Sequence, residues 1–354
     1  MSYLLIEIGG IKIRIKFHRA DRGLADDYKH FEIAEGTHDA VLNVTTVHPS
    51  VNPLDSEKNL SLTSSVTQMF LREYDHRFPK WDKMISDTAS EQIFAHRDKV
   101  FGALQNHHLR SWLEKYTEPS NKDIFLYPLF LDSLPSNNAG ILCADRKTWH
   151  AELFIDKRIS EIRDMFSQAL YILLSLLVHA QRGLLLHACG VASIRGTDLF
   201  LGSSGAGKTT VAKLSKSRFI MGDDGIILRK AEHRDDFIAH PTPWLQYKSA
   251  AGHGMHTNNA HDGINSSVRR LFFIKHGETL TVTKRSKAEA VRDIFLHLIH
   301  FAKYLDKQSA ATTFRVCAQL LNSAPAYEMV FARKSVLWPA LENINNYQKE
   351  EVIL

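Results

Sequence analysis

Cysteine is scarce in this sequence: only Cys143, Cys189 and Cys317 occur among 354 residues. The three are far apart, they lack the spacing of a metal site, and their odd number does not fit a disulfide framework. Unpaired, reduced cysteines are typical of the cytosol. We therefore expect a cytoplasmic protein.

The sequence also lacks a long apolar segment and a concentration of one charge. Its most apolar run, residues 169–180, is too short to span a bilayer. Residues 1–17 have neither the basic region nor the cleavage site of a signal peptide. The net charge of +5 is modest, and Lys and Arg are scattered along the chain. We therefore expect no membrane and no nucleic acid as partners, while the positive charge suits an anionic ligand such as ATP.

The chain does contain a glycine-rich loop of a defined type. Residues 202–209 read GSSGAGKT after the apolar strand 199–201, which matches the pattern G-x-x-x-x-G-K-[ST] of phosphate-binding loops. Glycine allows the positive φ angles with which a backbone wraps its N–H groups around phosphates. A helix that begins near Lys208 directs its N-terminal amides to the same place. The pattern predicts a nucleotide site, with Lys208 on the β and γ phosphates and the Thr209 hydroxyl on a divalent cation.

Two adjacent carboxylates, Asp223 and Asp224, come soon after a short predicted strand at 219–221. Ligands of α/β sheets bind at the C-terminal ends of strands. Beside a triphosphate, one carboxylate can hold Mg²⁺ while the other accepts the proton of an attacking hydroxyl. Aspartates followed by glycine also form ordinary turns, so these residues alone leave a purely structural role open.

The first 155 residues give weaker patterns than the region around the glycine-rich loop. Alternation of apolar and polar residues indicates strands, and aromatic residues at helical spacing are typical of a core. The predicted elements are a hairpin at 2–17 with its turn at Gly9-Gly10, a loop or short strand at 43–59, a partly helical region at 60–118, and a second hairpin formed by 140–143 and 149–155.

Residues 156–181 have the strongest helical pattern in the chain. Their apolar residues recur at every third or fourth position, which predicts one apolar stripe against a sheet, and Gly183 stands where helices commonly end. The apolar stretch 184–194 then predicts a strand interrupted by His187. A lone histidine in such a strand is typical of a core residue with one hydrogen bond, and a role in a site is the alternative.

Beyond Asp224 the chain alternates strands and helices. Residues 250–267 hold few apolar groups and predict a mobile loop that acts as a lid. Its histidines, His253, His256 and His261, lack a carboxylate or cysteine partner at metal-binding spacing. The other predicted elements are strands at 226–228 and 237–240, a stiff segment at 240–244 (HPTPW), a hairpin formed by 270–275 and 279–283, a helix capped by Ser286 and Glu289 that runs to about Tyr304, a helix at 308–322, a strand at 327–331 and a polar tail.

Three stretches in one order resemble a known family: LLLHACGV at 184–191, GSSGAGKTT at 202–210 and FIMGDD at 219–224. They resemble the HPr serine kinase/phosphorylase family, whose relatives include ATP-dependent phosphoenolpyruvate carboxykinase. The later stretches PTPW, RRLFFIK, RSKAEAVRDIF and PAYEMVFARKSVLW resemble its diverged members, often called HPr-kinase-like serine kinases. Some of these are associated with peptide natural products, including lasso peptides, and phosphorylate a serine of the precursor peptide. The resemblance covers residues 160–340.

The resemblance implies a kinase that uses ATP and Mg²⁺. Thr209 and Asp223 would hold the metal, Asp224 would accept the hydroxyl proton, Lys208 would act on the phosphates, and His187 would lie near them. The two aspartates could exchange these roles. The residues implied in ATP binding are Gly202, Ser203, Ser204, Gly205, Ala206, Gly207, Lys208, Thr209 and Thr210.

The resemblance also implies a fold class and a domain organisation. We expect an α/β protein with a P-loop-containing, HPr kinase/phosphoenolpyruvate carboxykinase-like nucleotide domain at 156–340. An N-terminal α+β domain at 1–155, with a role such as substrate recognition, would precede it, and a polar C-terminal tail at 341–354 would follow. The glycine- and arginine-rich signature of the family and its basic loop are not found. The resemblance therefore does not extend to HPr as the substrate or to the reverse phosphorylase reaction. Members of the family often form oligomers, so a homo-oligomer is one possibility for this chain.

Three functions are compatible with these residues. The first is transfer of the γ-phosphoryl group of ATP to a serine or threonine hydroxyl of a peptide or protein, with Arg269, Arg270 or Arg285 offsetting the charge of the transferring group. The second is transfer to a small-molecule hydroxyl, such as that of an amino acid or a sugar. The third is an ATP-binding regulatory protein without phosphotransfer, against which the two adjacent carboxylates argue.

Overall fold

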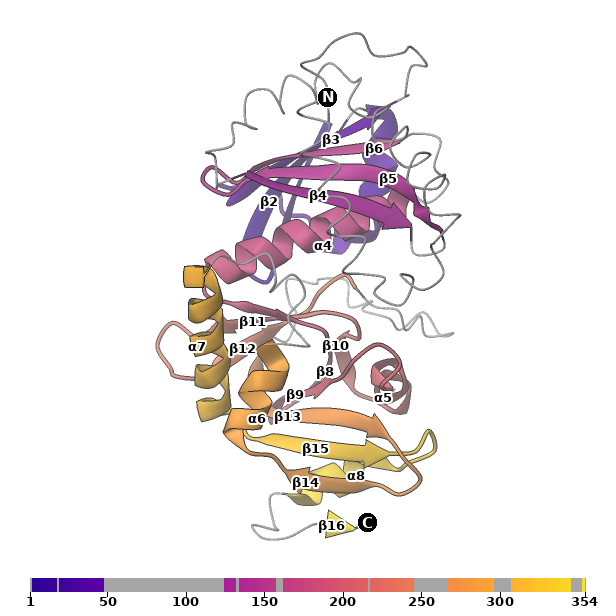
Figure 1. Cartoon of the computed structure of the whole chain (residues 1–354), viewed down its shortest axis with the longest axis vertical. Helices are drawn as coiled ribbons and strands as arrows, with labels where there is room; N and C mark the ends of the chain where they lie inside the picture. The colour runs from indigo at the N-terminus through magenta and orange to yellow at the C-terminus, as the bar shows by residue number, and fades with distance from the viewer. Residues whose placement is uncertain are drawn as a thin grey trace, which may run out of the picture. The chain divides into compact units, whose positions relative to one another are not determined.

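The protein is mixed α/β, with two mixed sheets and several helices, as the computed structural model in Figure 1 shows. The regions predicted as partly helical (60–118) and as a lid (250–267, up to residue 265) lie outside the described residues, and so do the lid's three histidines. The described residues are 2–17, 19–47, 124–131, 134–156, 162–215, 217–244, 266–295, 307–344 and 352–353.

The chain divides into two compact units. Unit 1 consists of Met1–Ile6 and Lys12–Leu173, and unit 2 consists of Glu7–Ile11 and Leu174–Leu354. The division falls inside helix α4 (Ile162–Ala180), beyond the boundary at residue 156 that the sequence predicts.

Unit 1 contains a six-stranded sheet with the strand order β1-β2-β3-β6-β5-β4. The hairpin predicted at 2–17 is confirmed, because Gly9 and Gly10 join β1 to β2 with φ angles of 61° and 73°, as in the two-residue turns that favour glycine. The second predicted hairpin is also confirmed, since β5 and β6 are antiparallel neighbours. The elements are β1 Ser2–Ile8, β2 Ile11–Phe17, η1 Arg19–Phe31, β3 Ala40–Val47, β4 Ile124–Leu131, β5 Leu134–Asp145 and β6 His150–Asp156.

Helix α4 is described from Ile162, and residue 156, where the sequence predicts the start of the helix, is the last residue of β6. Residues 169–179 of the helix are all buried, so the prediction of a single apolar stripe is wrong for this part. In the first two turns, which belong to unit 1, buried positions do alternate with more exposed ones. There Phe166 packs against Phe17 and Tyr28, with ring centroids 5.6 and 5.5 Å apart.

The C-terminal end of α4 differs from the prediction. The N–H of Arg182 donates to the carbonyl oxygen of His179 at 3.0 Å, and the N–H of Gly183 donates to that of Val178 at 2.8 Å, which is a Schellman arrangement. The left-handed residue is Arg182, with φ 58°, and not the glycine. Gly183 is required for another reason, because a Cβ there would lie 2.9 Å from the carbonyl oxygen of Leu228.

Unit 2 contains a ten-stranded sheet in which β10, β8, β9, β13, β12, β11 and β7 are successive neighbours. The hairpin predicted from 270–275 and 279–283 is wrong: β15 lies between β13 and β14, parallel to the first and antiparallel to the second. The elements are β7 Leu184–Leu186, β8 Ala188–Ser193, β9 Gly196–Leu201, α5 Lys208–Leu214, β10 Phe219–Gly222, β11 Ile226–Lys230, β12 Phe237–His240, β13 Ser266–His276, β14 Thr281–Lys284, α6 Lys287–Asp293, α7 Lys307–Ser323, β15 Ala326–Phe331, α8 Leu337–Asn343 and β16 Val352–Ile353.

Helices cover both faces of this sheet. Alternate residues of β9 show it: Leu199 and Leu201 belong to a core cluster with residues of α6 and α7, whereas Phe200 belongs to a cluster with residues of α5 and α8. Because both faces are buried, the strand before the glycine-rich loop is apolar at every one of these positions.

Two of the predictions concern the helices α6 and α8 of unit 2. The capping box is confirmed, because the Ser286 side chain accepts a hydrogen bond from the N–H of Glu289 at the start of α6. The polar tail predicted from residue 341 begins within α8, where Leu341 is fully buried and its carbonyl oxygen accepts a hydrogen bond from Arg270.

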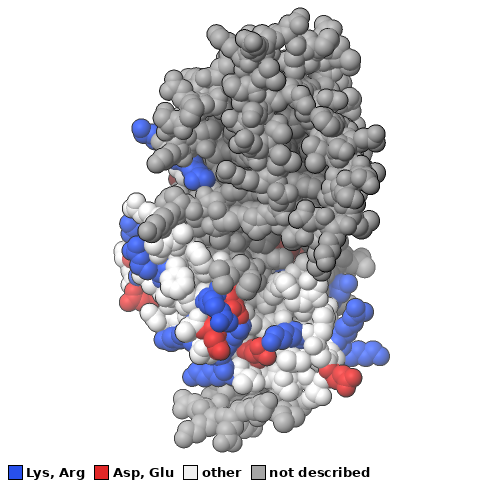
Figure 2. All heavy atoms as spheres, viewed as in Figure 1, with Lys and Arg blue, Asp and Glu red and all other residues white. Residues whose placement is uncertain are grey.

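The surface of unit 2 carries mixed charge. In the view of Figure 2, acidic and basic side chains of its described residues are interspersed and do not form a field of one sign. Among the described residues, no helix combines the length and the apolarity that crossing a membrane requires.

Candidate functional site

Three neighbouring strands of unit 2 bring the predicted site residues to one edge of the sheet. β8 and β9 are antiparallel, and the first residue of β8 pairs with the last residue of β9. β10 is antiparallel to β8 as well, and its last residue pairs with Gly190 near the start of β8. Residues that precede β8 or follow β9 and β10 therefore share an edge: these are His187, the glycine-rich loop from Gly202, and Asp223 with Asp224.

His187 lies where the stretch predicted as one strand divides into two. β7 pairs with β11, whereas β8 pairs with β9 and β10, so the chain changes neighbours at His187. Its Nε2 lies 3.0 Å from Oδ1 of Asp224. The structure thus brings together two predicted site residues, and His187 contacts a carboxylate in addition to being largely buried.

The glycine-rich loop uses glycine for two different reasons. Gly205 and Gly207 have φ angles of 81° and 108°, a region that other residues rarely adopt. A Cβ on Gly207 would also lie 2.9 Å from Cζ of Phe331. Residues 203–205 are exposed, and Thr209 and Thr210 are half-buried in the first turn of α5, which begins at Lys208 as predicted. The exposed residues leave the outer surface of the loop accessible to a ligand.

Lys208 lies under the loop that precedes it. Its Nζ donates hydrogen bonds to the carbonyl oxygens of Gly202 at 2.9 Å and Ser203 at 3.1 Å. The residue is only 6% exposed. The ammonium group is thereby held at the start of the loop, at the end of β9.

The charges around Lys208 show which groups share its surroundings. Burial lowers the pKa of Lys208, and the negative charges of Asp224 and Asp223 nearby oppose that change. Burial likewise raises the pKa of the Cys189 thiol, so this side chain stays protonated and neutral. Both predicted carboxylates therefore lie within electrostatic range of the lysine, Asp223 buried and Asp224 about one third exposed.

The turn that carries the carboxylates is anchored by the predicted stiff segment. Thr242, which is fully buried, donates its hydroxyl to the carbonyl oxygen of Gly225 at 2.6 Å and its N–H to strand β10 at 3.1 Å. A Cβ on Gly222 would lie 2.7 Å from the same Gly225 oxygen. The threonine and the glycine together fix the direction in which the two aspartates leave β10.

His276, which falls between the two strands of the hairpin predicted at 270–275 and 279–283, contacts the loop. Its Nε2–H donates to the carbonyl oxygen of Gly205 at 2.9 Å, and its ring lies 5.9 Å from that of Phe331. It ends β13, the parallel neighbour of β9. Residues that follow two parallel neighbours lie at the same edge, so a prediction of this strand pairing would have identified His276.

The arginines suggested for offsetting the charge of the transferring group lie elsewhere, and that interpretation is wrong for this structure. Arg269 and Arg270 both bind Asp198, near the start of β9 and at the opposite end of the strand from the loop. Arg285 binds Asp293. Each guanidinium thus pairs with a carboxylate of the protein itself.

The described residues contain no group of three or more His, Cys, Asp and Glu side chains arranged to hold a metal ion. The oxygen ligands available at the edge are the Thr209 hydroxyl and the two aspartates, which suit a hard cation such as Mg²⁺ better than a transition metal.

A comparison of the chain with models of protein families found no match, and a comparison with curated proteins found none either. What the site can do is therefore inferred from its residues. A cation under a glycine-rich loop, beside two carboxylates, can bind an anionic group and place it near a proton acceptor.

Proposed function

We propose that the protein is an ATP-dependent kinase that transfers the γ-phosphoryl group to a serine or threonine hydroxyl of a peptide or protein. The observation that carries this proposal is that strands β8, β9 and β10 bring Lys208, Asp223 and Asp224 to one edge beside the glycine-rich loop, where the charges of both carboxylates act on the pKa of the lysine. Phosphoryl transfer needs a cation on the phosphates and a carboxylate that accepts the hydroxyl proton. In this proposal, unit 2 is a P-loop-containing nucleotide domain of the HPr-kinase-like type.

ATP would bind along the loop at 202–210. An ammonium group has three N–H donors, and Lys208 uses two of them on loop carbonyls, which leaves the third for a phosphate oxygen. The Thr209 hydroxyl and the Asp223 carboxylate would hold Mg²⁺. Because Mg²⁺ in nucleotide sites takes most ligands from phosphates and water, two protein oxygens suffice. The bound ion would neutralise charge on the transferring group.

Asp224 would act as the proton acceptor. As the acceptor hydroxyl loses its proton to the carboxylate, its oxygen forms a bond to the γ-phosphorus. The bond between that phosphorus and the β–γ bridging oxygen breaks, and ADP leaves with the electron pair. His187, 3.0 Å from Asp224, would orient the carboxylate.

The test is phosphate transfer by the purified full-length protein, supplied with γ-labelled ATP, Mg²⁺ and a library of peptides that contain serine or threonine. Mass spectrometry locates the new phosphate. We expect Asp224→Asn to lower the rate by about 100-fold or more, since loss of a general base costs about that much. Asp235→Asn is the matched control, because this carboxylate is 99% exposed and far from the loop in the sequence; it should keep the wild-type rate.

The same experiment separates the other functions. Transfer to no acceptor, together with an Asp224→Asn variant that equals the wild type in ATP turnover, would reject a kinase. If labelled phosphate is found only on small-molecule alcohols added to the reaction, the acceptor is a small molecule and not a peptide or protein. Loss of ATP binding in Lys208→Ala, with no phosphorylated product in any reaction, would instead indicate a regulatory protein.

A further inference from the structure

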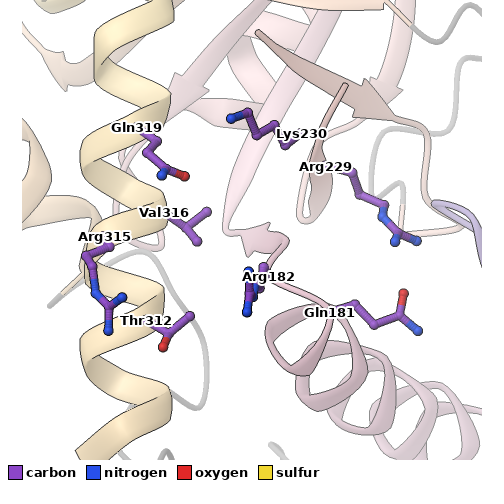
Figure 3. Close-up of a pocket in the computed structure, with 8 residues that line it drawn as sticks. All are labelled: Gln181, Arg182, Arg229, Lys230, Thr312, Arg315, Val316 and Gln319. Atoms are coloured by element: carbon purple, nitrogen blue, oxygen red, sulfur yellow. The ribbon is translucent and has the colours of Figure 1, made fainter. Parts of the chain in front are cut away.

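Unit 2 has a cavity away from the candidate site. Its volume is about 430 Å³, and its walls are the C-terminal end of α4, strand β11 and helix α7 (Figure 3). β7 and β11 are antiparallel. At one end of this strand pair, Arg182 precedes β7 and Lys230 ends β11, and the cavity lies there. At the other end, His187 follows β7 and Asp224 precedes β11. The cavity and the candidate site are therefore at opposite ends of the same strand pair.

The cavity is strongly basic. Four of its eight lining residues are cationic and none is acidic: the cations are Arg182, Arg229, Lys230 and Arg315. They come from three elements that are far apart in the sequence. Bringing four like charges around one cavity is unfavourable unless an anion offsets them, so this arrangement calls for a negatively charged occupant.

Within the part of the chain that the structure describes, these charges are compensated only weakly. Among the described residues, Lys230 is the one of the four with a salt bridge, 2.9 Å to Asp235, and that carboxylate is 99% exposed, where ion pairs contribute little. Arg229 donates to the carbonyl oxygens of Gly9 and Gly10 at 3.3 and 3.2 Å. Arg315 donates its Nε to a carbonyl of its own helix. Neutral carbonyls leave the positive charges in place.

Arg182 occupies a position that normally favours glycine. Its φ of 58° costs roughly 1 kcal/mol or more for a residue with a Cβ. The negative end of the α4 dipole accounts for a basic residue here, but Arg229 and Arg315 lie on other elements. Arg182 thus adds a cation to the cavity at a position where glycine would be less strained.

We propose that this cavity binds a small molecule with two or more anionic groups, either phosphates or carboxylates. Guanidinium groups bind both in a two-pronged manner, and three of the four cations are arginines. The remaining polar lining, which includes Gln319 and Thr312, provides hydrogen bonds for the rest of the ligand. The volume is in the range of small-molecule sites. This site does not depend on the kinase proposal.

The test is calorimetric titration of the full-length protein with two probes, inorganic pyrophosphate and citrate. We expect saturable binding of at least one probe, and its identity distinguishes a phosphate ligand from a carboxylate ligand. The double variant Arg182→Gly/Arg315→Ala should bind about tenfold more weakly or worse, the effect of losing one strong charged contact. Glycine is chosen at position 182 because it adopts the left-handed conformation without strain. Arg315→Ala alone, at an exposed position, serves if the double variant does not fold.

Because the glycine-rich loop can also bind pyrophosphate, that titration is repeated on Lys208→Ala, in which cavity binding should persist. The matched control is Arg195→Ala/Lys284→Ala, which removes two exposed cations outside the cavity and should bind as the wild type does. Equal weakening in this control would overturn the proposal, since the attraction would then be non-specific. No binding of either probe at millimolar concentration would also overturn it, as would tighter binding of a hexaglutamate peptide, which would assign the cavity to peptide docking.

Discussion

His179, in the last turn of α4, is a buried histidine whose ring is neutral in the folded protein at neutral pH. Neither of its ring nitrogens has a hydrogen-bond partner among the described residues. Burial lowers its pKa to about 4, and the backbone of Gly183 opposes this change only in part. A proton on the ring would therefore be more costly in the folded protein than in the unfolded chain.

This histidine predicts how stability depends on pH. The unfolded chain takes up the proton near pH 6.5, whereas the folded protein takes it up only near pH 4, so the free energy of unfolding falls as the pH decreases between these values. Between pH 7 and pH 5 the loss from this residue amounts to about 2 kcal/mol. The free energy of unfolding, measured with urea at both pH values, should therefore fall by about 2 kcal/mol less in His179→Leu than in the wild type. His233→Leu, whose ring is 93% exposed, should keep the wild-type dependence; if it behaves like His179→Leu, the explanation is wrong.

At this scale the sequence identifies residues whose roles depend on neighbours in the chain. Lys208 begins α5 as predicted because the loop and the helix start form one continuous motif. The arginine assignments failed because the partner of Arg269 and Arg270, Asp198, is about 70 residues away. His276 was missed for the same reason, since it reaches Gly205 across 71 positions.

At the scale of elements, the glycine-rich loop is held from outside by β13. The hydrogen bond from His276 to Gly205 and the contact of its ring with Phe331 fix the exposed part of the loop. A neutral hydrogen bond contributes about 1 kcal/mol. We therefore expect His276→Ala to weaken ATP binding about fivefold, an energy that corresponds to this bond.

The measurement is nucleotide affinity by calorimetry. His276→Gln keeps an N–H donor and should recover part of the affinity for ATP. If the ring contact with Phe331 were the only contribution, His276→Ala and His276→Gln would bind ATP equally weakly. His233→Ala is the comparison variant and should keep the wild-type affinity, because the ring of His233 is 93% exposed. Wild-type affinity in His276→Ala would contradict the predicted role.

The elements themselves are more predictable than their pairing. Local alternation and helical spacing located β10, β11, β12, α7 and β15 within a few residues. The hairpin from β13 to β14 failed because β15, about 40 residues later in the chain, supplies the hydrogen bonds that both strands need. A pattern of apolar residues indicates that a strand is buried, but it does not specify its neighbour.

At the scale of the whole molecule, unit 2 depends on the last tenth of the chain. Met329 and Phe331 of β15 and Leu337 and Leu341 of α8 belong to the same core cluster as Phe200 of β9. We expect a chain that ends at residue 325 to lose cooperative unfolding of unit 2, because the core on that face of the sheet would be open to water. A chain that ends at residue 344 keeps both elements and should retain a cooperative thermal transition. Calorimetry distinguishes the two, and a cooperative transition of unit 2 in the shorter chain would contradict this dependence.

The position of β15 has a consequence for the protein during its synthesis. The glycine-rich loop leaves the ribosome more than a hundred residues before β15 does, yet Phe331 packs against Gly207 in the finished fold. Domains fold only when their parts have been translated. The nascent chain therefore carries the complete loop sequence for more than a hundred residues of elongation without the support that gives the loop its shape.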